Sequence, residues 1–421
     1  MKNAILHLKH SSVCILLFCL YLCPSHISAQ VIEAGYGKGN VLKFDQWLIN
    51  DGLKQQDAQS YWAGYIYQTH AKENCAYASD YDYPTFTFGL LVADFNNVRL
   101  NYSHQGRRPI HEDSRCGTSY VAYASFRRAL FRSRSGWSAD YTFANGIGYN
   151  THIYNRYANV DNVMLSSYLS VYFNIAFALN YRYQQYEFFI GPEFRHLSNG
   201  GTVRPNKGIN KAGLGGGIRY YLQDYDSISF TRLNQPFEEK CLFFNIGYSS
   251  GIRASQGEWL YDANNYIWKN NDVDNIKYGK DGYQMCYYHV VSTDLMYRYA
   301  RRYASGIGLD ILYEPYNCDI ETQIEGKRPE EVKWSFGLAA KHEVFFRRLS
   351  MQMTIGWYLR RPFNQYSNTT EEYPYYERVG IRYNPPILNN SISLGYNIYA
   401  HLTKAYGTEL VLSYKLPSIK F

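Results

Sequence analysis

Two residues that can share a proton stand two positions apart, at the end of a predicted strand. His196 and Ser198 are followed by Asn199 and by Gly200 and Gly201. Side chains at i and i+2 of a β-strand lie on one face, with Cβ atoms about 7 Å apart, so the imidazole can accept the serine proton. Asn199 and the two glycine amides are candidate donors to an oxyanion. The group therefore has the residue types that nucleophilic acyl transfer requires.

The alternation along the same strand predicts which way the pair points. Ile190 and Phe194 share the face of His196, whereas Glu193 and Arg195 lie on the other face. We therefore expect the pair to face lipid, near the rim where a long loop begins. A site that faces hydrocarbon would act on an ester carried by a membrane lipid. A polar collar at the membrane boundary is the alternative interpretation, and the pattern alone leaves it open.

Strands of the same kind fill the chain from about residue 60 onward. In 165–183 the odd positions are apolar in all but one case, and the even positions are polar, small or tyrosine. The alternation recurs in 349–360, 392–399 and 409–416. A mean hydropathy of −0.42 excludes a polytopic helical membrane protein, and the 18% aromatic content argues against disorder.

The connections between these strands indicate a barrel. Tight joins are predicted at 94–97, 184–185 and 347–348, and long loops at 71–83, 107–117, 149–163, 199–211, 252–283, 317–332 and 361–373. Short turns at one rim and long loops at the other are typical of outer-membrane barrels. We predict an all-β chain that forms an antiparallel transmembrane β-barrel of about 14–16 strands. The barrel would span residues 60–421, after a segment of uncertain structure, residues 30–59.

Residues 1–29 have the pattern of a secretory signal peptide. A basic start precedes an apolar stretch over 13–22 that is too short to span a bilayer, and small residues precede Gln30. A lipoprotein signal at Cys23 is the alternative, although the residue before it is bulky. The pattern predicts export.

The cysteines beyond the leader suggest a cross-link in an oxidising compartment. Five remain after residue 29, so at least one thiol stays unpaired. The predicted loops 71–83 and 107–117 share a rim, and we expect a disulfide between Cys75 and Cys116. Two unpaired loop cysteines are the alternative.

The site residues belong to a longer pattern that resembles a known family. It consists of His196-Leu197-Ser198-Asn199-Gly200, Pro205-Asn206 and Gly208-Ile209-Asn210. This pattern resembles the signature of the PagL-like lipid A 3-O-deacylases, described broadly as acyloxyacyl hydrolases. The resemblance is densest over about residues 136–223. It implies an outer-membrane barrel esterase whose serine attacks the ester-linked acyl chain of lipid A, with no metal or cofactor. Carried over by position, it implies that Ser198 is the nucleophile, His196 the base and Asn199 an oxyanion donor.

One feature of that pattern is missing from this chain. The family's acid, which orients the histidine, follows the motif closely, yet residues 200–212 contain no Asp or Glu. Asn210 stands at about the right position and shares the face of His196. Its amide oxygen can hold the imidazole tautomer but stabilises the imidazolium less than a carboxylate does. Asp161, in the neighbouring long loop, is a substitute acid if that loop folds over, or else a solvated loop residue.

Other features of the sequence exclude competing functions. Residues 247–251 match the G-x-S-x-G spacing around Ser249, but no helix pattern follows, so a nucleophile elbow is not expected. The formal charge of +7 comes from 43 basic and 36 acidic residues that are scattered, which does not favour nucleic acid as a partner. We predict an esterase in the outer membrane of a Gram-negative bacterium, with lipid A or lipopolysaccharide as substrate. A non-catalytic barrel, either a pore or a structural protein, is the alternative.

Overall fold

The structure is a computed structural model of the chain. It describes residues 30–44, 52–101, 114–225, 228–238, 240–267, 272–315, 333–361, 374–401 and 404–420. Within these ranges, no helix combines the length and the apolar character needed to cross a membrane. The signal peptide predicted for residues 1–29 lies outside the described residues, as does Cys318.

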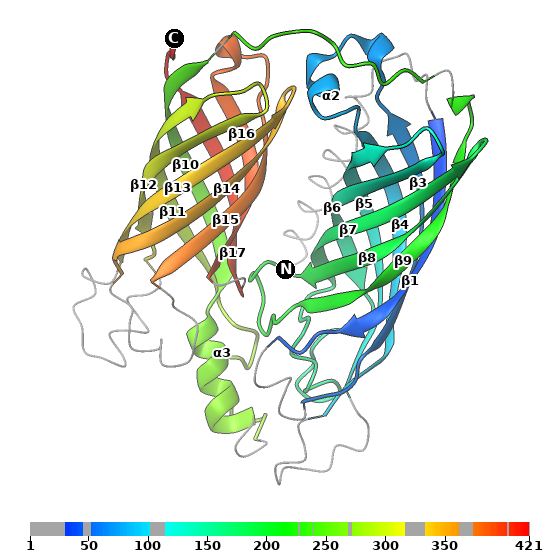
Figure 1. Cartoon of the computed structure of the whole chain (residues 1–421). Coiled ribbons are helices and arrows are strands. Elements are labelled where there is room, and N and C mark those ends of the chain that lie inside the picture. Colours follow the sequence, from blue (N-terminus) through cyan, green and yellow to red (C-terminus); the bar gives the residue numbers. More distant parts are fainter. Residues whose placement is uncertain are drawn as a thin grey trace.

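The described strands form two closed antiparallel barrels of eight long strands each (Figure 1). The first barrel contains β1 (Gln30–Val41), β3 (Asp57–Gln68), β4 (Thr85–Leu100), β5 (Ser114–Arg132), β6 (Trp137–Asn150), β7 (Leu169–Tyr183), β8 (Tyr186–Ser198) and β9 (Ile209–Tyr221). It closes because β9 returns to pair with β1. The short strand β2 (Leu53–Gln55) pairs with the end of β4.

The second barrel follows a connection over residues 222–240. It contains β10 (Cys241–Ala254), β11 (Met285–Arg298), β12 (Tyr303–Tyr313), β13 (Trp334–Phe346), β14 (Leu349–Arg360), β15 (Tyr375–Tyr383), β16 (Ile392–His401) and β17 (Lys404–Lys415). It closes where β10 pairs with both β11 and β17. The short strand β18 (Ile419–Lys420) pairs with the start of β10.

The two ends of the barrels carry different connections. Two-residue turns join β7 to β8 and β13 to β14, at the end that we call the turn end. The turn end also carries the 3-10 turn η2 (Ala71–Glu73), the helix α2 (Ala76–Asp80) and the 3-10 turn η7 (Leu388–Asn390). At the opposite end, the loop end, lie residues 151–168 and 199–208, together with the described parts of a longer loop, 255–267 and 272–284. The last of these loops contains α3 (Gln256–Asp262) and the π-helical turn η5 (Ala263–Ile267).

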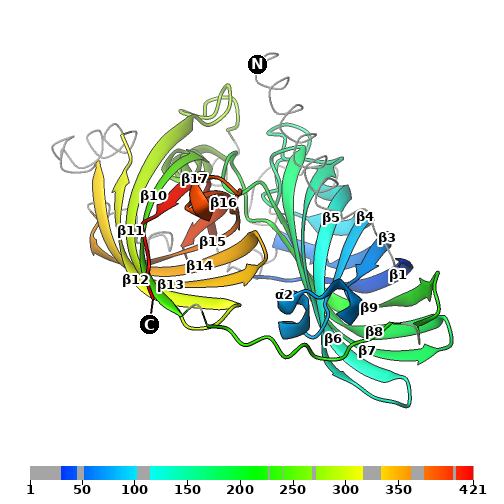
Figure 2. The same cartoon turned by 90° about the horizontal axis from the view of Figure 1, so that it is seen from above.

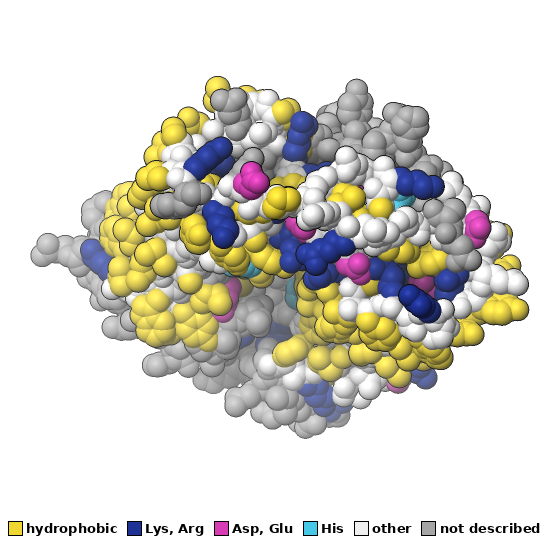
Figure 3. Space-filling view, turned by 45° about the horizontal axis from the view of Figure 1, so that its top comes forward, with side chains coloured by type: hydrophobic (Ala, Val, Ile, Leu, Met, Phe, Trp, Pro, Cys, Tyr) yellow, Lys and Arg dark blue, Asp and Glu magenta, His cyan; other side chains and the backbone are white. Residues whose placement is uncertain are grey.

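The outer surface of each barrel is apolar and the interior is polar. On β7, Phe177 and Leu179 are 51% and 46% exposed, whereas Asn174 and Asn180 point inward and are buried. Hydrophobic side chains cover much of the sides of both barrels in Figure 3. This is the reverse of a soluble barrel and fits strands that meet lipid on one face. The alternation predicted from the sequence is therefore confirmed.

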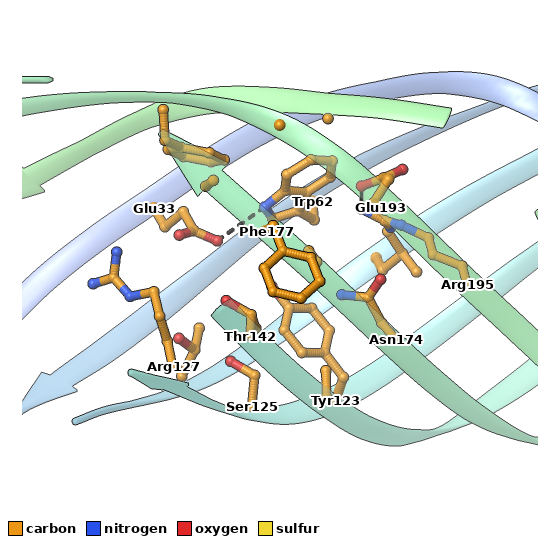
Figure 4. A pocket seen from close by; sticks show the side chains of 18 of the residues that line it. Glu33, Trp62, Tyr123, Ser125, Arg127, Thr142, Asn174, Phe177, Glu193 and Arg195 are labelled. Atoms are coloured by element: carbon orange, nitrogen blue, oxygen red, sulfur yellow. Dashed lines mark hydrogen bonds and ion pairs between the residues drawn. The ribbon is translucent and has the colours of Figure 1, made fainter. Parts of the chain in front are cut away.

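Charged pairs fill the interior of the first barrel. Glu187 accepts hydrogen bonds from Arg127 and Arg219 at 3.2 and 2.7 Å, and Glu193 accepts one from Arg195 at 2.7 Å. Eight strands leave an interior that side chains can fill. A cavity of about 60 Å³ remains, and its wall is drawn in Figure 4.

The second barrel is filled in a similar way, with more tyrosine. Asp310 accepts hydrogen bonds from Lys341 and Arg378 at 3.1 and 2.7 Å. The rings of Tyr376 and Tyr399 are fully buried and pack with centroids 5.8 Å apart. In both interiors these buried carboxylates are paired with basic side chains.

The all-β antiparallel barrel architecture is confirmed, but the strands close as two barrels instead of one. Alternation predicts which side chains face outward, but it does not predict which two strands pair to close a barrel. Here β1 lies within residues 30–59, which had no predicted structure, and it receives β9. Residues 60–421 are consequently shared between two barrels.

Residues 94–97 belong to a β-bulge and not to the tight join that the sequence predicts. The join predicted at 94–97 lies within β4, whose pairing with β5 shifts between Phe95 and Arg99. A bulge adds residues to one strand without reversing it, and its polar residues resemble those of a turn. Without that reversal, loop 69–84 lies at the turn end and the start of β5 lies at the loop end.

The predicted disulfide between Cys75 and Cys116 is therefore wrong. Both cysteines are free and buried, and they lie at opposite ends of the first barrel. Arg347 donates to the Cys75 sulfur at 3.2 Å, and the Cys116 sulfur lies 3.9 Å from Asn162 Oδ1.

The two barrels lie side by side (Figures 1 and 2), and side chains join them near both ends. At the turn end, the ring of Phe346 packs against Tyr81 and Phe86 with centroids 5.9 and 5.0 Å away. At the loop end, Val163 of the first barrel shares a buried apolar cluster with Trp259 and Ile267 of the second.

Candidate functional site

The imidazole of His196 is held by its cross-strand partner. His196 on β8 pairs with Asn210 on β9, and Nδ1 of the ring lies 2.7 Å from Oδ1 of the amide. Because a carbonyl oxygen can only accept, Nδ1 carries the proton and Nε2 carries the lone pair. Asn210 therefore sets the tautomer that a general base needs, at the position where the sequence placed it.

His196 shares the outward face of β8. Its neighbours at i−6 and i−8, Ile190 and Phe188, are 60% and 50% exposed, whereas Glu193 and Arg195 are buried in the interior. The pairing of β8 with β9 runs in register from Tyr186 to Leu197. Strand parity therefore directs the imidazole away from the interior.

Ser198 is the last residue of β8, and Gly208 lies next to both Ser198 and the imidazole of His196. A Cβ added to Gly208 would lie 2.8 Å from His196 Cε1 and 3.4 Å from Ser198 Cβ, so these two atoms are no more than about 6 Å apart. Gly208 also has a φ of 72°, which favours glycine. In the described residues Ser198 makes no hydrogen bond to His196, and its Oγ instead lies 3.4 Å from the N–H of Gly200.

Asn199 holds the loop that follows β8. Its Nδ2 donates to Val203 O at 2.8 Å and to Ser166 Oγ at 3.2 Å, and its Oδ1 accepts from Gly201 N at 3.0 Å. The side chain is thus occupied on both sides. Of the three oxyanion donors expected from the sequence, the N–H of Gly200 is the one turned toward Ser198.

The loop over residues 151–168 packs on the same site. Val163 O and Met164 O accept from Lys207 N and Gly208 N, each at 3.0 Å. Asp161 in this loop is buried, and its own N–H donates to Ser114 Oγ at 3.1 Å. No bond joins Asp161 to His196 in the described part of the chain, so the loop folds over without delivering the substitute acid.

Ser249 lies away from this site. It is buried on the inward face of β10, in mid-strand, where it pairs with Val290 and Val411. A nucleophile elbow requires a strand-to-helix turn. The prediction that this G-x-S-x-G spacing is not an elbow is confirmed.

Sequence reasoning missed the residues of the second barrel that reach the site. Gly200 and Gly201 lie against Thr408 and the backbone of Tyr406, and Gly201 O accepts from Ala254 N at 2.8 Å. These contacts join residues more than fifty positions apart. The glycine pair, which follows the motif directly, was the only local signal of a close approach.

Comparison with known families matches both halves of the chain. A family model described as "Lipid A 3-O-deacylase (PagL)" matches residues 81–219, and one described as "Acyloxyacyl hydrolase, C-terminal domain" matches residues 264–418. The first match contains His196, Ser198 and Asn210. A search of curated proteins gave no significant match.

Several solved structures align with the chain at low sequence identity and low TM-score. A ferric enterobactin receptor from Pseudomonas aeruginosa is 8% identical, with a TM-score of 0.24; the alignment covers 90% of this chain and 54% of the receptor. An outer membrane channel from Pseudomonas putida is 9% identical, with a TM-score of 0.21; the alignment covers 94% of this chain and 100% of the channel. A mutant porin of Rh. blastica is 6% identical, with a TM-score of 0.16; the alignment covers 92% of this chain and 100% of the porin.

The two family matches are separate in sequence: the first covers β4 to β9 of the first barrel, and the second covers β11 to β17 of the second. Together they span most of the chain, and the first contains the His–Ser motif on which the resemblance rested. The chain therefore belongs to the PagL family of lipid A 3-O-deacylases and carries the C-terminal domain of the acyloxyacyl hydrolases.

Proposed function

We propose that this protein is an outer-membrane esterase that removes an ester-linked acyl chain from lipid A or a related glycolipid. Membership of the PagL family supports lipid A deacylase activity and the outer-membrane location. The apolar outer surface of both barrels supports a membrane setting. The observation that carries the proposal is the 2.7 Å bond between His196 Nδ1 and Asn210 Oδ1, beside Ser198.

In the proposed reaction, Nε2 of His196 takes the proton of Ser198 as Oγ attacks the ester carbonyl. Rotation of the Ser198 side chain would bring Oγ from the Gly200 amide to Nε2. The carbonyl π electrons move to the oxygen, and the N–H of Gly200 then stabilises that oxyanion. The imidazolium next protonates the sugar oxygen as the ester bond breaks. Water, activated by the same histidine, releases the fatty acid from Ser198.

Asn199 and Asn210 have different roles in this proposal. Asn210 holds the imidazole tautomer by accepting from Nδ1. Asn199 is a positioning residue, because both ends of its amide are used to hold the loop that carries Gly200. An oxyanion role for the Asn199 side chain would require it to leave those bonds. The backbone amide of Gly200 is therefore the donor that we propose.

The approach path of the substrate follows from the outward face. On the same outward face, Phe194, Ile190 and Leu214 lie between His196 and the turn end of the barrel. Ile190 and Leu214 are 60% and 61% exposed. An acyl chain that lies against this apolar strip would bring its ester to the level of Ser198. No cofactor or metal is part of the proposed mechanism.

The experiment is a comparison of lipid A from outer membranes that contain wild type, Ser198→Ala or His196→Asn protein. Mass spectrometry should show loss of one acyl chain with wild type and intact lipid A with both variants. Intact lipid A in all three samples, with barrels that fold, would contradict the proposal. Ion conductance across planar bilayers would then favour the pore, although the filled interior of the first barrel argues against a wide one.

A further inference from the structure

The loop that carries the proposed oxyanion donor is seated on the wall of the second barrel. A Cβ at Gly200 would lie 2.4 Å from Thr408 Cγ2 and 3.5 Å from Ile398 Cδ1, both on the outward face of that barrel. A Cβ at Gly201 would lie 2.6 Å from Tyr406 O. Only glycine permits so close an approach, and both residues have positive φ values of 66° and 82°.

Hydrogen bonds tie the same loop to the end of β10. Gly201 O accepts from Ala254 N at 2.8 Å, and Arg204 Nε donates to Ala254 O at 3.2 Å. Ala254 is fully buried and pairs with Met285 on β11. The loop thus docks on the rim of the second barrel through one backbone–backbone hydrogen bond and one bond from the Arg204 side chain.

A second path reaches the site through the long loop of the second barrel. Trp259 of α3 packs edge-on against Tyr154 at 5.6 Å, and Asp274 accepts from the Tyr157 hydroxyl at 3.1 Å. Tyr154 and Tyr157 belong to loop 151–168, whose carbonyls accept from Lys207 N and Gly208 N. The second barrel therefore contacts the start of loop 199–208 directly and supports its end through loop 151–168.

We propose that the second barrel is a positioning element for the esterase site of the first barrel, acting through Thr408 and Ile398 on the Gly200–Gly201 turn. This inference rests on the proposed function. The wall holds the Gly200 amide within 3.4 Å of Ser198 Oγ, where an oxyanion donor is needed. A displacement of about 1 Å at such a site lowers the rate by up to about a hundredfold.

The test uses the full-length protein in lipid vesicles and a double variant, Ile398→Ala with Thr408→Ala. Two quantities are measured: the turnover of lipid A, and the rate at which a small fluorophosphonate labels Ser198. We expect both to fall by about ten- to hundredfold. The small probe does not depend on lipid binding, so its rate reports the geometry around Ser198 itself.

Two further variants serve as controls. Leu394→Ala with Leu412→Ala changes the same two strands on the same outward face, at residues that are 52% and 50% exposed, and should leave both rates unchanged. Thr408→Val loses the hydroxyl, as Thr408→Ala does, but keeps the methyl group that contacts Gly200. With native Ile398, Ser198 of the Thr408→Val variant should therefore be labelled at the wild-type rate. Ser198 of the single Thr408→Ala variant should be labelled more slowly.

The outcomes separate this inference from the proposed function. Unchanged labelling and turnover in the double variant would overturn the positioning role. A higher KM with unchanged labelling would also overturn it, because the wall would then only contact the lipid. If Ser198→Ala still deacylates lipid A, the proposed function itself fails. Single Thr408→Ala provides the measurement if the double variant does not fold, as judged by circular dichroism.

Discussion

Each barrel carries a histidine and a serine on its outward face. The two residues are hydrogen-bonded to each other in the second barrel, whereas the pair that matches the family motif lies in the first. In the second barrel, Ser305 Oγ lies 2.9 Å from His342 Nδ1, across the pairing of β12 with β13. In the first barrel, His196 is hydrogen-bonded to Asn210, and among the described residues it has no hydrogen bond to Ser198. A His–Ser hydrogen bond alone is therefore a poor criterion for a site.

The difference lies in the backbone around each serine. Ser305 stands inside β12, paired with Tyr297 on one side and His342 on the other, so the neighbouring amides belong to the sheet. Ser198 ends its strand, and the following turn aims the Gly200 amide at its oxygen. In the second barrel, Nδ1 of the histidine already contacts the serine, which leaves no equivalent of Asn210 on that nitrogen. The two serines therefore differ in whether a backbone amide outside the sheet points at the hydroxyl oxygen, as an oxyanion donor must.

The largest expected effect separates the two serines directly. Ser198→Ala should lower lipid A turnover by about 10⁴-fold or more, as loss of a nucleophile does, whereas Ser305→Ala should leave turnover unchanged. Fluorophosphonate labelling followed by peptide mapping measures the same contrast. Labelled Ser305 with unlabelled Ser198 would reverse the roles assigned to the two barrels.

A smaller effect is expected from crowding the imidazole. Gly208→Ala places a methyl group 2.8 Å from His196 Cε1 and should lower the turnover number about a hundredfold. Gly282→Ala is the matched control, because Gly282 also has a positive φ but has nothing within 4 Å of an added Cβ. Both variants bear the strain of the left-handed backbone, so equal loss of turnover in the two would refute the contact with His196.

The smallest effect is expected from a change that adds a carboxylate beside the imidazole of His196. Asn210→Asp supplies a carboxylate to Nδ1 of His196, which stabilises the imidazolium that forms during attack, and should raise turnover roughly tenfold or more. Asn265→Asp, an exposed position in η5, adds the same charge elsewhere and should have no effect. Turnover in the Asn210→Asp variant at or below that of wild type would argue against an orienting role for Asn210.

The local pattern predicted much of the fold. Strands 349–360 and 392–399, the turns at 184–185 and 347–348, and the outward direction of apolar residues were all readable, because alternation with period two reports one-sided contact with an apolar phase. The bulge at 94–97 was not readable, since polar residues that interrupt a strand look the same in a turn and in a bulge.

The candidate site was predicted in part for the same reason. His196 and Asn210 share a face on adjacent strands, and parity along each strand was sufficient to expect their contact. The contribution of Asn199 to the loop could not be predicted, because its partners Ser166 and Val203 depend on how two loops pack.

The sequence pattern predicts most of the strands with their inward and outward faces, and it places the chemical groups at the end of β8. These properties follow from the order of neighbouring residues. That sixteen strands close as two barrels, and that the second barrel contacts the Gly200–Gly201 turn, is visible only in the three-dimensional structure. Closure depends on pairing between strands far apart in the chain, β9 with β1 and β17 with β10, and the free energy of such pairing is a property of the whole sheet.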